Sequence, residues 1–262
     1  MKNIDFFISE GELERRKGNL KEEMEGRNID LTCFFQPSQI IYLTGIYLIP
    51  TERPIALLFD KEEYSLFLPL LEGEHAEKRG NVRNVITYDE YPGKKHPMRI
   101  LGEEIEKYNA GKLGADSDGY GSSYGYRGPS LSDVVEADVT LIPEVVEELK
   151  EIKSQEEIDL LKKSAEWANY AHRLLQEYTE PGKVENEIAA NASLDATMAM
   201  NKALGGDFFP LRGDTFPASA VYYGQIGRKS ALPHSLTTNE TIEEGDVLTS
   251  GAGSDSSRAP GA

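Results

Sequence analysis

Leu31-Thr32-Cys33-Phe34-Phe35 is the stretch that decides the fold class of this chain. It is apolar, too short for a stable helix and bounded by Pro37-Ser38, which is typical of a buried strand. A further strand is predicted near Ile40–Leu43. Similar short runs predict strands at Ile55–Phe59, Ser65–Leu68, Asn84–Thr87, Lys112–Ala115 and Asp138–Leu141.

Helical patterns alternate with these strands. Ser9 and Glu12 have the spacing of a capping box, which predicts a first helix that runs to about Gly26. His96-Pro97 precedes an amphipathic pattern, and proline is favoured at the start of a helix. The apolar positions of this pattern are Met98, Leu101, Ile105 and Tyr108. Strands that alternate with helices favour an α/β layer domain.

The sequence changes character after Pro143. Helix signals continue to about Met200, with a second capping box at Ser154 and Glu157 and a break at Pro181-Gly182. Short strands are predicted at Ala218–Tyr223 and Asp246–Leu248, whereas Ser254–Ala262 is small, polar and expected to form no element. We therefore assign residues 1–147 to one domain and 148–262 to another, with the boundary in the connector Glu147–Lys153.

Composition excludes several functions. The 262 residues exceed what one hydrophobic core usually serves, and the net charge of -17 repels a phosphate backbone, so nucleic acid is not an expected partner. The N-terminus lacks the pattern of a signal peptide, and no apolar run approaches the ~20 residues of a membrane helix. We expect no membrane partner and a cytoplasmic location.

Two other features have structural interpretations. Cys33 lies within the apolar run, where a thiol usually behaves as a small buried hydrophobe, and a lone cysteine forms no disulfide within one chain. The stretch Gly119–Gly128 is rich in glycine and tyrosine, but its spacing fits neither a P-loop nor a dinucleotide fingerprint. A structural loop is favoured over a phosphate cradle or an aromatic stacking strip.

The histidines are scattered. His75, His96 and His172 have no partner at the spacing that metal sites commonly use, so packing or surface roles are expected. His234 differs, because it follows Pro233 and lies eleven residues before Gly245. Chemistry alone leaves a surface histidine and a functional one equally open at this position.

The chain resembles the pita-bread metallopeptidases, the family of creatinase, prolidase and Xaa-Pro aminopeptidase. The resemblance rests on motifs in the order that this family has them. They are Asn28-Ile29-Asp30-Leu31 with Pro37–Gly45; Ile152-Lys153-Ser154 with Glu157-Ile158, Pro181-Gly182 and Glu185–Ile188; and Pro233-His234 with Gly245-Asp246-Val247.

The resemblance implies an α/β creatinase/prolidase-like N-terminal domain followed by the first half of an α+β pita-bread domain. It further implies a homodimer that hydrolyses the peptide bond before proline in small peptides, using two divalent metal ions (Mn, Co or Zn). His234 matches the family histidine that stabilises the reacting carbonyl or the leaving group, and is the catalytic residue that we predict.

The departures from the family concern the metal. The position of the first family ligand, an Asp, is Gly251, and about eleven residues further the second position falls on Ala262. Asp255 alone cannot hold a catalytic metal. The later ligands would lie beyond Ala262, so we expect no metal ligands here, an incomplete chain, and marginal stability or association of the half-domain.

Two alternatives remain open. Relatives of this fold also cleave small C–N or C–S substrates, and the loss of the first Asp slightly favours such altered chemistry. The chain could instead be a non-catalytic module that binds a basic partner, which its negative charge suits.

Overall fold

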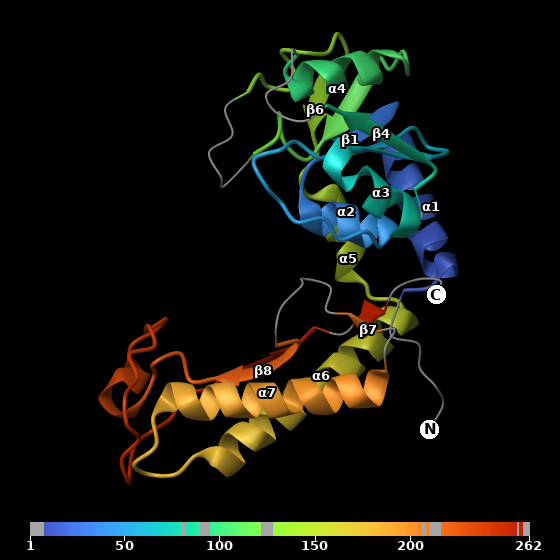
Figure 1. The fold of residues 1–262 in the computed structure, drawn as a ribbon. Coiled ribbons are helices and arrows are strands. Elements are labelled where there is room, and N and C mark those ends of the chain that lie inside the picture. Colours follow the sequence, from blue (N-terminus) through green and yellow to red (C-terminus); the bar gives the residue numbers. More distant parts are fainter. Residues whose placement is uncertain are drawn as a thin grey trace. The chain divides into compact units, whose positions relative to one another are not determined.

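The computed structural model describes residues 8–79, 82–89, 95–121, 128–205, 208–209, 216–255 and 257–258. These residues form two compact units, Ile8–Lys153 and the residues from Ser154 onward (Figure 1). Each unit has its own buried apolar clusters.

The described part of the first unit contains a mixed sheet in the order β4-β3-β2-β1-β5-β6. Its strands are β1 (Leu31–Phe34), β2 (Ala56–Phe59), β3 (Tyr64–Pro69), β4 (Asn84–Tyr88), β5 (Lys112–Ala115) and β6 (Asp138–Leu141). The pairs β1–β2 and β2–β3 are antiparallel, whereas β3–β4, β1–β5 and β5–β6 are parallel. The predicted run Leu31–Phe35 therefore supplies a central strand of this sheet.

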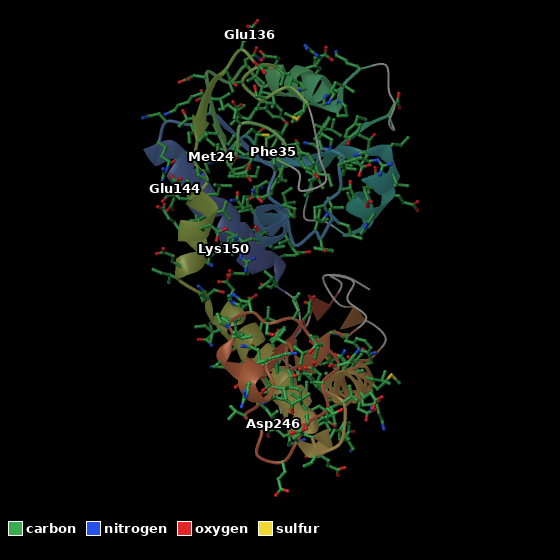
Figure 2. All side chains as sticks on the ribbon, turned by 90° about the vertical axis from the view of Figure 1, so that its left-hand side faces the viewer. Met24, Phe35, Glu136, Glu144, Lys150 and Asp246 are labelled. Atoms are coloured by element: carbon green, nitrogen blue, oxygen red, sulfur yellow. The ribbon has the colours of Figure 1, made fainter. Side chains whose placement is uncertain are left out.

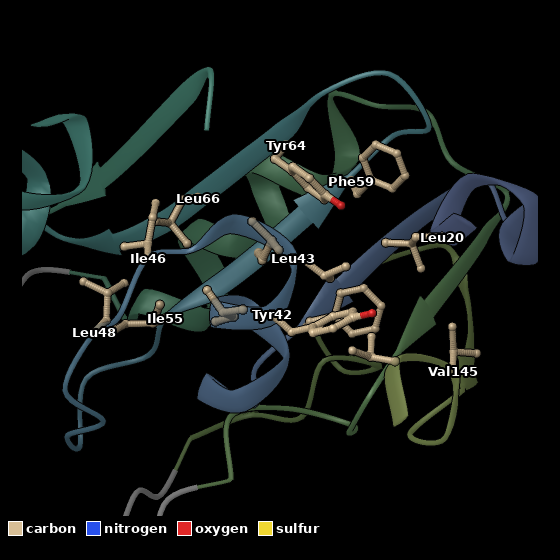
Figure 3. Close-up of a cluster of buried hydrophobic side chains, with 14 of the residues drawn as sticks. Leu20, Tyr42, Leu43, Ile46, Leu48, Ile55, Phe59, Tyr64, Leu66 and Val145 are labelled. Carbon is tan, nitrogen blue, oxygen red and sulfur yellow. The ribbon is translucent and has the colours of Figure 1, made fainter. Parts of the chain in front are cut away.

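Helices cover both faces of the sheet. They are α1 (Glu10–Gly26), α2 (Pro37–Thr44), α3 (Leu70–Arg79), α4 (Pro97–Glu106) and α5 (Val145–Glu151). Alternate residues of a strand point to opposite faces, so Cys33 joins the cluster that includes α4, while Phe34 joins the cluster that includes α1, α2 and α5. Figure 3 shows the second of these clusters, where Leu20, Leu43 and Val145 meet the sheet.

The predicted first helix, the helix after His96-Pro97 and all but one of the strands predicted for the first unit are confirmed. The strand predicted at Ile40–Leu43 is wrong, because these residues lie in α2. Pro37 begins this helix and Gly45, at φ 74°, ends it in the left-handed conformation. A short apolar run does not by itself distinguish a strand from a buried helix. Helix α3 was not predicted.

The second unit packs two long helices on a small sheet. The helices are α6 (Gln155–Tyr178) and α7 (Glu185–Leu204), followed by the 3-10 helix η1 (Gly227–Ala231). The strands are β7 (Phe208–Phe209), β8 (Ala218–Val221), β9 (Gly251–Ser254) and β10 (Ser257–Arg258). β8 pairs with β9, β10 pairs with β7, and α6 and α7 pack against the β8–β9 sheet.

The capping box at Ser154, the helix break at Pro181-Gly182 and the strand at the start of Ala218–Tyr223 are confirmed. The strand predicted at Asp246–Leu248 is wrong. Leu248 forms only an isolated bridge to Ile226, and the strand β9 begins later, at Gly251. The expectation that Ser254–Ala262 forms no element is also wrong, since Ser254 ends β9 and β10 follows it.

Among the described residues, no helix combines the length and apolar character that crossing a lipid bilayer requires.

Ser154→Ala is expected to lower the free energy of unfolding by about 1 kcal/mol, because it removes the side chain that caps α6. Ser154 Oγ accepts a hydrogen bond from Glu157 N at 3.2 Å, and the Glu157 carboxylate accepts one from Ser154 N at 2.7 Å. Urea unfolding followed by circular dichroism measures the change. Glu157→Gln keeps an acceptor and is the control; an equal loss in both variants would contradict this interpretation.

Candidate functional site

Among the described residues, α6 and α7 pack against one face of the β8–β9 sheet. Ala218 and Ala220 are buried in the cluster with α6 and α7. Since alternate residues face opposite sides, Ser219 and Val221 alternate with these alanines, although Val221 also packs partly against the same cluster. Their partners across the ladder are Gly253 and Gly251. We call the surface that these residues form, with Tyr223 at its end, the open face.

The helix-facing side of β9 is tied to α6. Ser254 Oγ donates a hydrogen bond to the carbonyl oxygen of Ser164 at 2.7 Å. His172 Nε2 and Ser250 Oγ lie 2.8 Å apart and share a hydrogen bond. These contacts fix the orientation of β9, so that Gly251 faces away from α6.

Tyr223 occupies the space beside Gly251. A Cβ atom placed on Gly251 would lie 2.7 Å from Cε2 of the Tyr223 ring. Tyr223 has a positive φ of 54° and is 53% exposed, so its ring lies at the surface next to the glycine. A non-glycine residue in this backbone region is uncommon. The position where the resemblance implies a first metal ligand thus offers no side-chain donor atom, and the neighbouring Tyr223 ring crowds it.

His234 lies in a turn directly after η1. Its side chain is exposed and its φ is 52°. The surrounding loop is braced by a hydrogen bond from Gln225 Nε2 to the carbonyl oxygen of Leu232 at 2.9 Å, and by one from Lys229 Nζ to Thr238 Oγ1 at 2.9 Å. This loop follows β8, which carries part of the open face. The catalytic role of His234 stays a prediction.

Asp246, which is labelled in Figure 2, comes from the Gly245-Asp246 motif and has a structural role. Its Oδ2 accepts a hydrogen bond from Glu243 N at 2.8 Å. A Cβ atom on Gly227, whose φ is 54°, would lie 2.6 Å from Asp246 Oδ1, so a side chain at this position would displace the Asp246 carboxylate. Gly227 N also donates to the carbonyl oxygen of Val247 at 2.9 Å. The motif therefore fastens the base of the loop that carries His234.

The side chains do not fit a two-metal centre. Within the part of the chain that the structure describes, no group of three or more His, Cys, Asp and Glu side chains is placed to hold a metal ion. His75 lies 3.4 Å from the Glu72 carboxylate on the same helix, and His96 Nδ1 accepts a hydrogen bond from Met98 N as the cap of α4. Asp255 is held through its backbone N–H, which donates to Pro217 O at 2.7 Å.

Cys33 is a buried hydrophobe, as predicted. Burial and the nearby charge of Asp116 raise the pKa of its thiol well above the usual range. The thiolate, which is the reactive form, is therefore disfavoured. Cys33 contributes packing rather than chemistry.

Cys33 is expected not to react with a thiol reagent in the native protein and to react fully in denaturant, because its side chain is inaccessible. The rate of labelling by dithionitrobenzoate measures this. The matched control is Ser38→Cys, which places a second thiol on an exposed position of α2. Rapid native labelling of Cys33 at the rate of the control would show that the first unit is open.

The stretch Gly119–Gly128 falls largely outside the described residues, which omit 122–127, so its predicted loop role stays a prediction there. Gly119 has a φ of 124°, and the Tyr120 hydroxyl donates to the carbonyl oxygen of Thr51 at 2.6 Å. Tyr120 also borders a small apolar hollow that is partly open to solvent. Its lining residues are Phe35, Pro37, Ile40, Ile46, Leu48, Pro50, Ile55 and Tyr120.

Similar proteins share both sequence and fold with this chain. It is 28% identical over 232 residues to an Xaa-Pro dipeptidase of Pyrococcus horikoshii, covering 87% of this chain and 56% of the relative. It is 27% identical over 242 residues to an Xaa-Pro dipeptidase of Pyrococcus furiosus, covering 90% of this chain and 59% of that relative. The chain thus spans less than two thirds of the length of these curated relatives.

Solved structures agree on the fold. The Xaa-Pro dipeptidase from Bacillus anthracis matches with a TM-score of 0.67 at 19% identity, over 92% of this chain and 61% of that one. The prolidase from Pyrococcus horikoshii matches with a TM-score of 0.63 at 23% identity, over 89% of this chain and 59% of the prolidase chain. The predicted fold class, an α/β N-terminal domain followed by part of a pita-bread domain, is confirmed.

The N-terminal region shows which family the chain belongs to. The Creatinase/Prolidase N-terminal domain matches residues 16–152, which is more than half of the chain. This range contains the motifs Asn28–Leu31 and Pro37–Gly45 that carried the resemblance, and it ends beside the α5–α6 connection. The chain belongs to the creatinase/prolidase family.

Proposed function

We propose that this chain acts in the hydrolysis of the peptide bond that precedes proline, on small peptides. The observation that carries the proposal is the 28% identity, over 87% of this chain, to an Xaa-Pro dipeptidase. Because the chain spans only 56% of that relative, the activity is proposed for a protein that contains this chain.

His234 is the catalytic residue of this proposal. Its exposed imidazole can donate a hydrogen bond to a developing oxyanion or to the leaving group. The fastened base of its loop, at Gly227 and Asp246, limits the positions that the ring can take. Restricting a catalytic group before the substrate arrives reduces the entropy that the reaction loses.

The proposed activity includes dependence on divalent metal ions, but the described residues do not supply their ligands. Gly251 has no side-chain donor atom, and the described residues hold no group of three or more candidate ligands, so the divalent ions (Mn, Co or Zn) would need ligands outside the described residues. We derive no catalytic step through them. Assignment of residues 1–147 to an N-terminal domain and 148–262 to a partial pita-bread domain, homodimer formation and a cytoplasmic location complete the proposal and rest on the sequence.

Peptide recognition can be tested on the chain directly. Titration with Ala-Pro, followed by amide and histidine-ring resonances in NMR, is expected to shift His234, Tyr223 and Gly251. Ala-Ala is the matched ligand without the proline ring, and is expected to cause much smaller shifts. Equal shifts with both peptides, or shifts confined to the first unit, would contradict the proposed specificity.

A non-catalytic binding module is the second candidate. The Tyr223 ring over Gly251 favours it, because a crowded position without a donor is unsuited to metal. The net charge of -17 then indicates a basic partner. Salt-sensitive binding of a Lys/Arg-rich peptide, together with no response to Ala-Pro, would support this candidate over the peptidase.

A further inference from the structure

The segment Gly224–Thr238, which carries His234, is closed at its base. We call it the histidine loop. A Cβ atom on Gly224 would lie only 2.1 Å from the carbonyl oxygen of Leu236, and the φ of Gly224 is 66°. The two ends of the loop therefore touch through their backbones, and this contact requires glycine.

A single carboxylate bonds both ends of the histidine loop. Glu185 Oε2 accepts a hydrogen bond from Gly224 N at 3.1 Å, and Glu185 Oε1 accepts one from Thr238 N at 3.0 Å. Each oxygen thus holds one end. The backbone of the same residue adds a further tie, because Glu185 N donates to the carbonyl oxygen of Glu240 at 2.9 Å.

Glu185 is unusual for a charged residue. It is the first residue of α7 and only 1% exposed. In the described part of the chain, its carboxylate makes no ion pair within 4.0 Å. Burying a charge is unfavourable unless hydrogen bonds compensate for the lost water, and bonds to a charged acceptor are stronger than neutral ones. The two loop amides are thus the partners that stabilise the carboxylate in this position.

We propose that Glu185 is the positioning residue of His234: by joining Gly224 to Thr238 it fixes the base of the histidine loop and so the place of the imidazole. The catalytic consequence rests on the proposed function, whereas the positioning itself does not. Since α7 packs against β8, the clamp links the loop to the same framework that carries the open face.

The test compares Glu185→Gln with Glu187→Gln in the full chain. In Glu185→Gln an amide NH₂ replaces one oxygen and faces a backbone N–H, so one of the two bonds is lost. Hydrogen exchange at the amide of Gly224 or Thr238 is expected to accelerate about tenfold or more. The His234 ring resonances are expected to move and to approach those of a mobile histidine.

Glu187→Gln removes a charge two positions along the same helix, at an exposed site, and is expected to leave both readouts unchanged. If Glu185→Gln does not fold, hydrogen exchange is measured in the unaltered protein instead. Protection of the Gly224 and Thr238 amides above that of exposed loop amides supports the bonds to Glu185, and equal protection contradicts them. Unchanged exchange and an unmoved His234 in a folded Glu185→Gln protein would overturn the inference. Failure of the Ala-Pro titration would instead count against the peptidase function alone.

Discussion

Gly102→Ala is expected to lower the free energy of unfolding of the first unit by about 3 kcal/mol or to rearrange α4. A Cβ atom on Gly102 would lie 2.2 Å from the carbonyl oxygen of Val134 and 3.1 Å from the Val134 Cβ. The backbone oxygen cannot rotate away as a flexible side chain could, so the helix must shift. Urea unfolding, followed by circular dichroism, measures the loss.

Gly18→Ala is the matched control. Gly18 also lies inside a helix, α1, but a Cβ atom there meets nothing within 4 Å. Alanine is favoured over glycine in an open helix position by about 1 kcal/mol, so this variant is expected to be more stable than the parent. The two substitutions should therefore have opposite signs. Stabilisation by both would show that α4 does not pack closely against Val134.

Asp116→Ala is expected to lower the free energy of unfolding by about 2–4 kcal/mol, because it leaves buried backbone donors without an acceptor. Phe35 N donates to Asp116 Oδ1 at 2.9 Å, and Gln36 N donates to Oδ2 at 2.7 Å. These two donors lie immediately before α2, so the Asp116 carboxylate, which follows β5, holds the backbone that leads into this helix. Burial raises the pKa of Asp116, and these backbone N–H donors oppose that increase.

Asp118→Ala supplies the comparison at an exposed position. Asp118 accepts a hydrogen bond from Ser132 N at 2.8 Å, but water can replace it. A loss of no more than about 1 kcal/mol is expected. Urea unfolding followed by circular dichroism measures both aspartate variants. Equal losses of unfolding free energy in the two variants would show that burial does not determine how much Asp116 stabilises the fold.

The sequence predicted those parts of the fold that short-range patterns determine. Runs such as Leu31–Phe35 and Asp138–Leu141 were found as strands because their apolar character and flanking residues are local signals. The ends of α1 and α6 were found because the caps at Ser9 and Ser154 act within three residues. The alternation of these elements was enough to identify the α/β unit.

The errors have different causes. Helix α2 was missed because a short apolar run does not distinguish a strand from a buried helix, although Pro37 and Gly45 bound the helix locally. The short strand β10 depends on its pairing with β7, far earlier in the chain. There a tertiary contact overrode local propensity.

The candidate site was predicted only in part. Family motifs indicated His234 and the glycine at the first ligand position, but neither Tyr223 nor Glu185 had a separate signal of function. Glu185 lies 39 and 53 residues from its two hydrogen-bond donors, and the Tyr223 ring meets Gly251 only because β8 pairs with β9. The arrangement around the site becomes visible only in three dimensions.

The most direct measurement is hydrolysis of Ala-Pro by this chain joined to the part of the Pyrococcus horikoshii relative outside the aligned 56%, with Mn²⁺, Co²⁺ or Zn²⁺ added. The control is the same polypeptide with His234→Ala. We predict hydrolysis that prefers Ala-Pro over Ala-Ala and falls about 100-fold or more in the control. Equal hydrolysis of both peptides, undiminished activity without His234, or turnover of small C–N or C–S substrates alone by the folded polypeptide would contradict the proposed function.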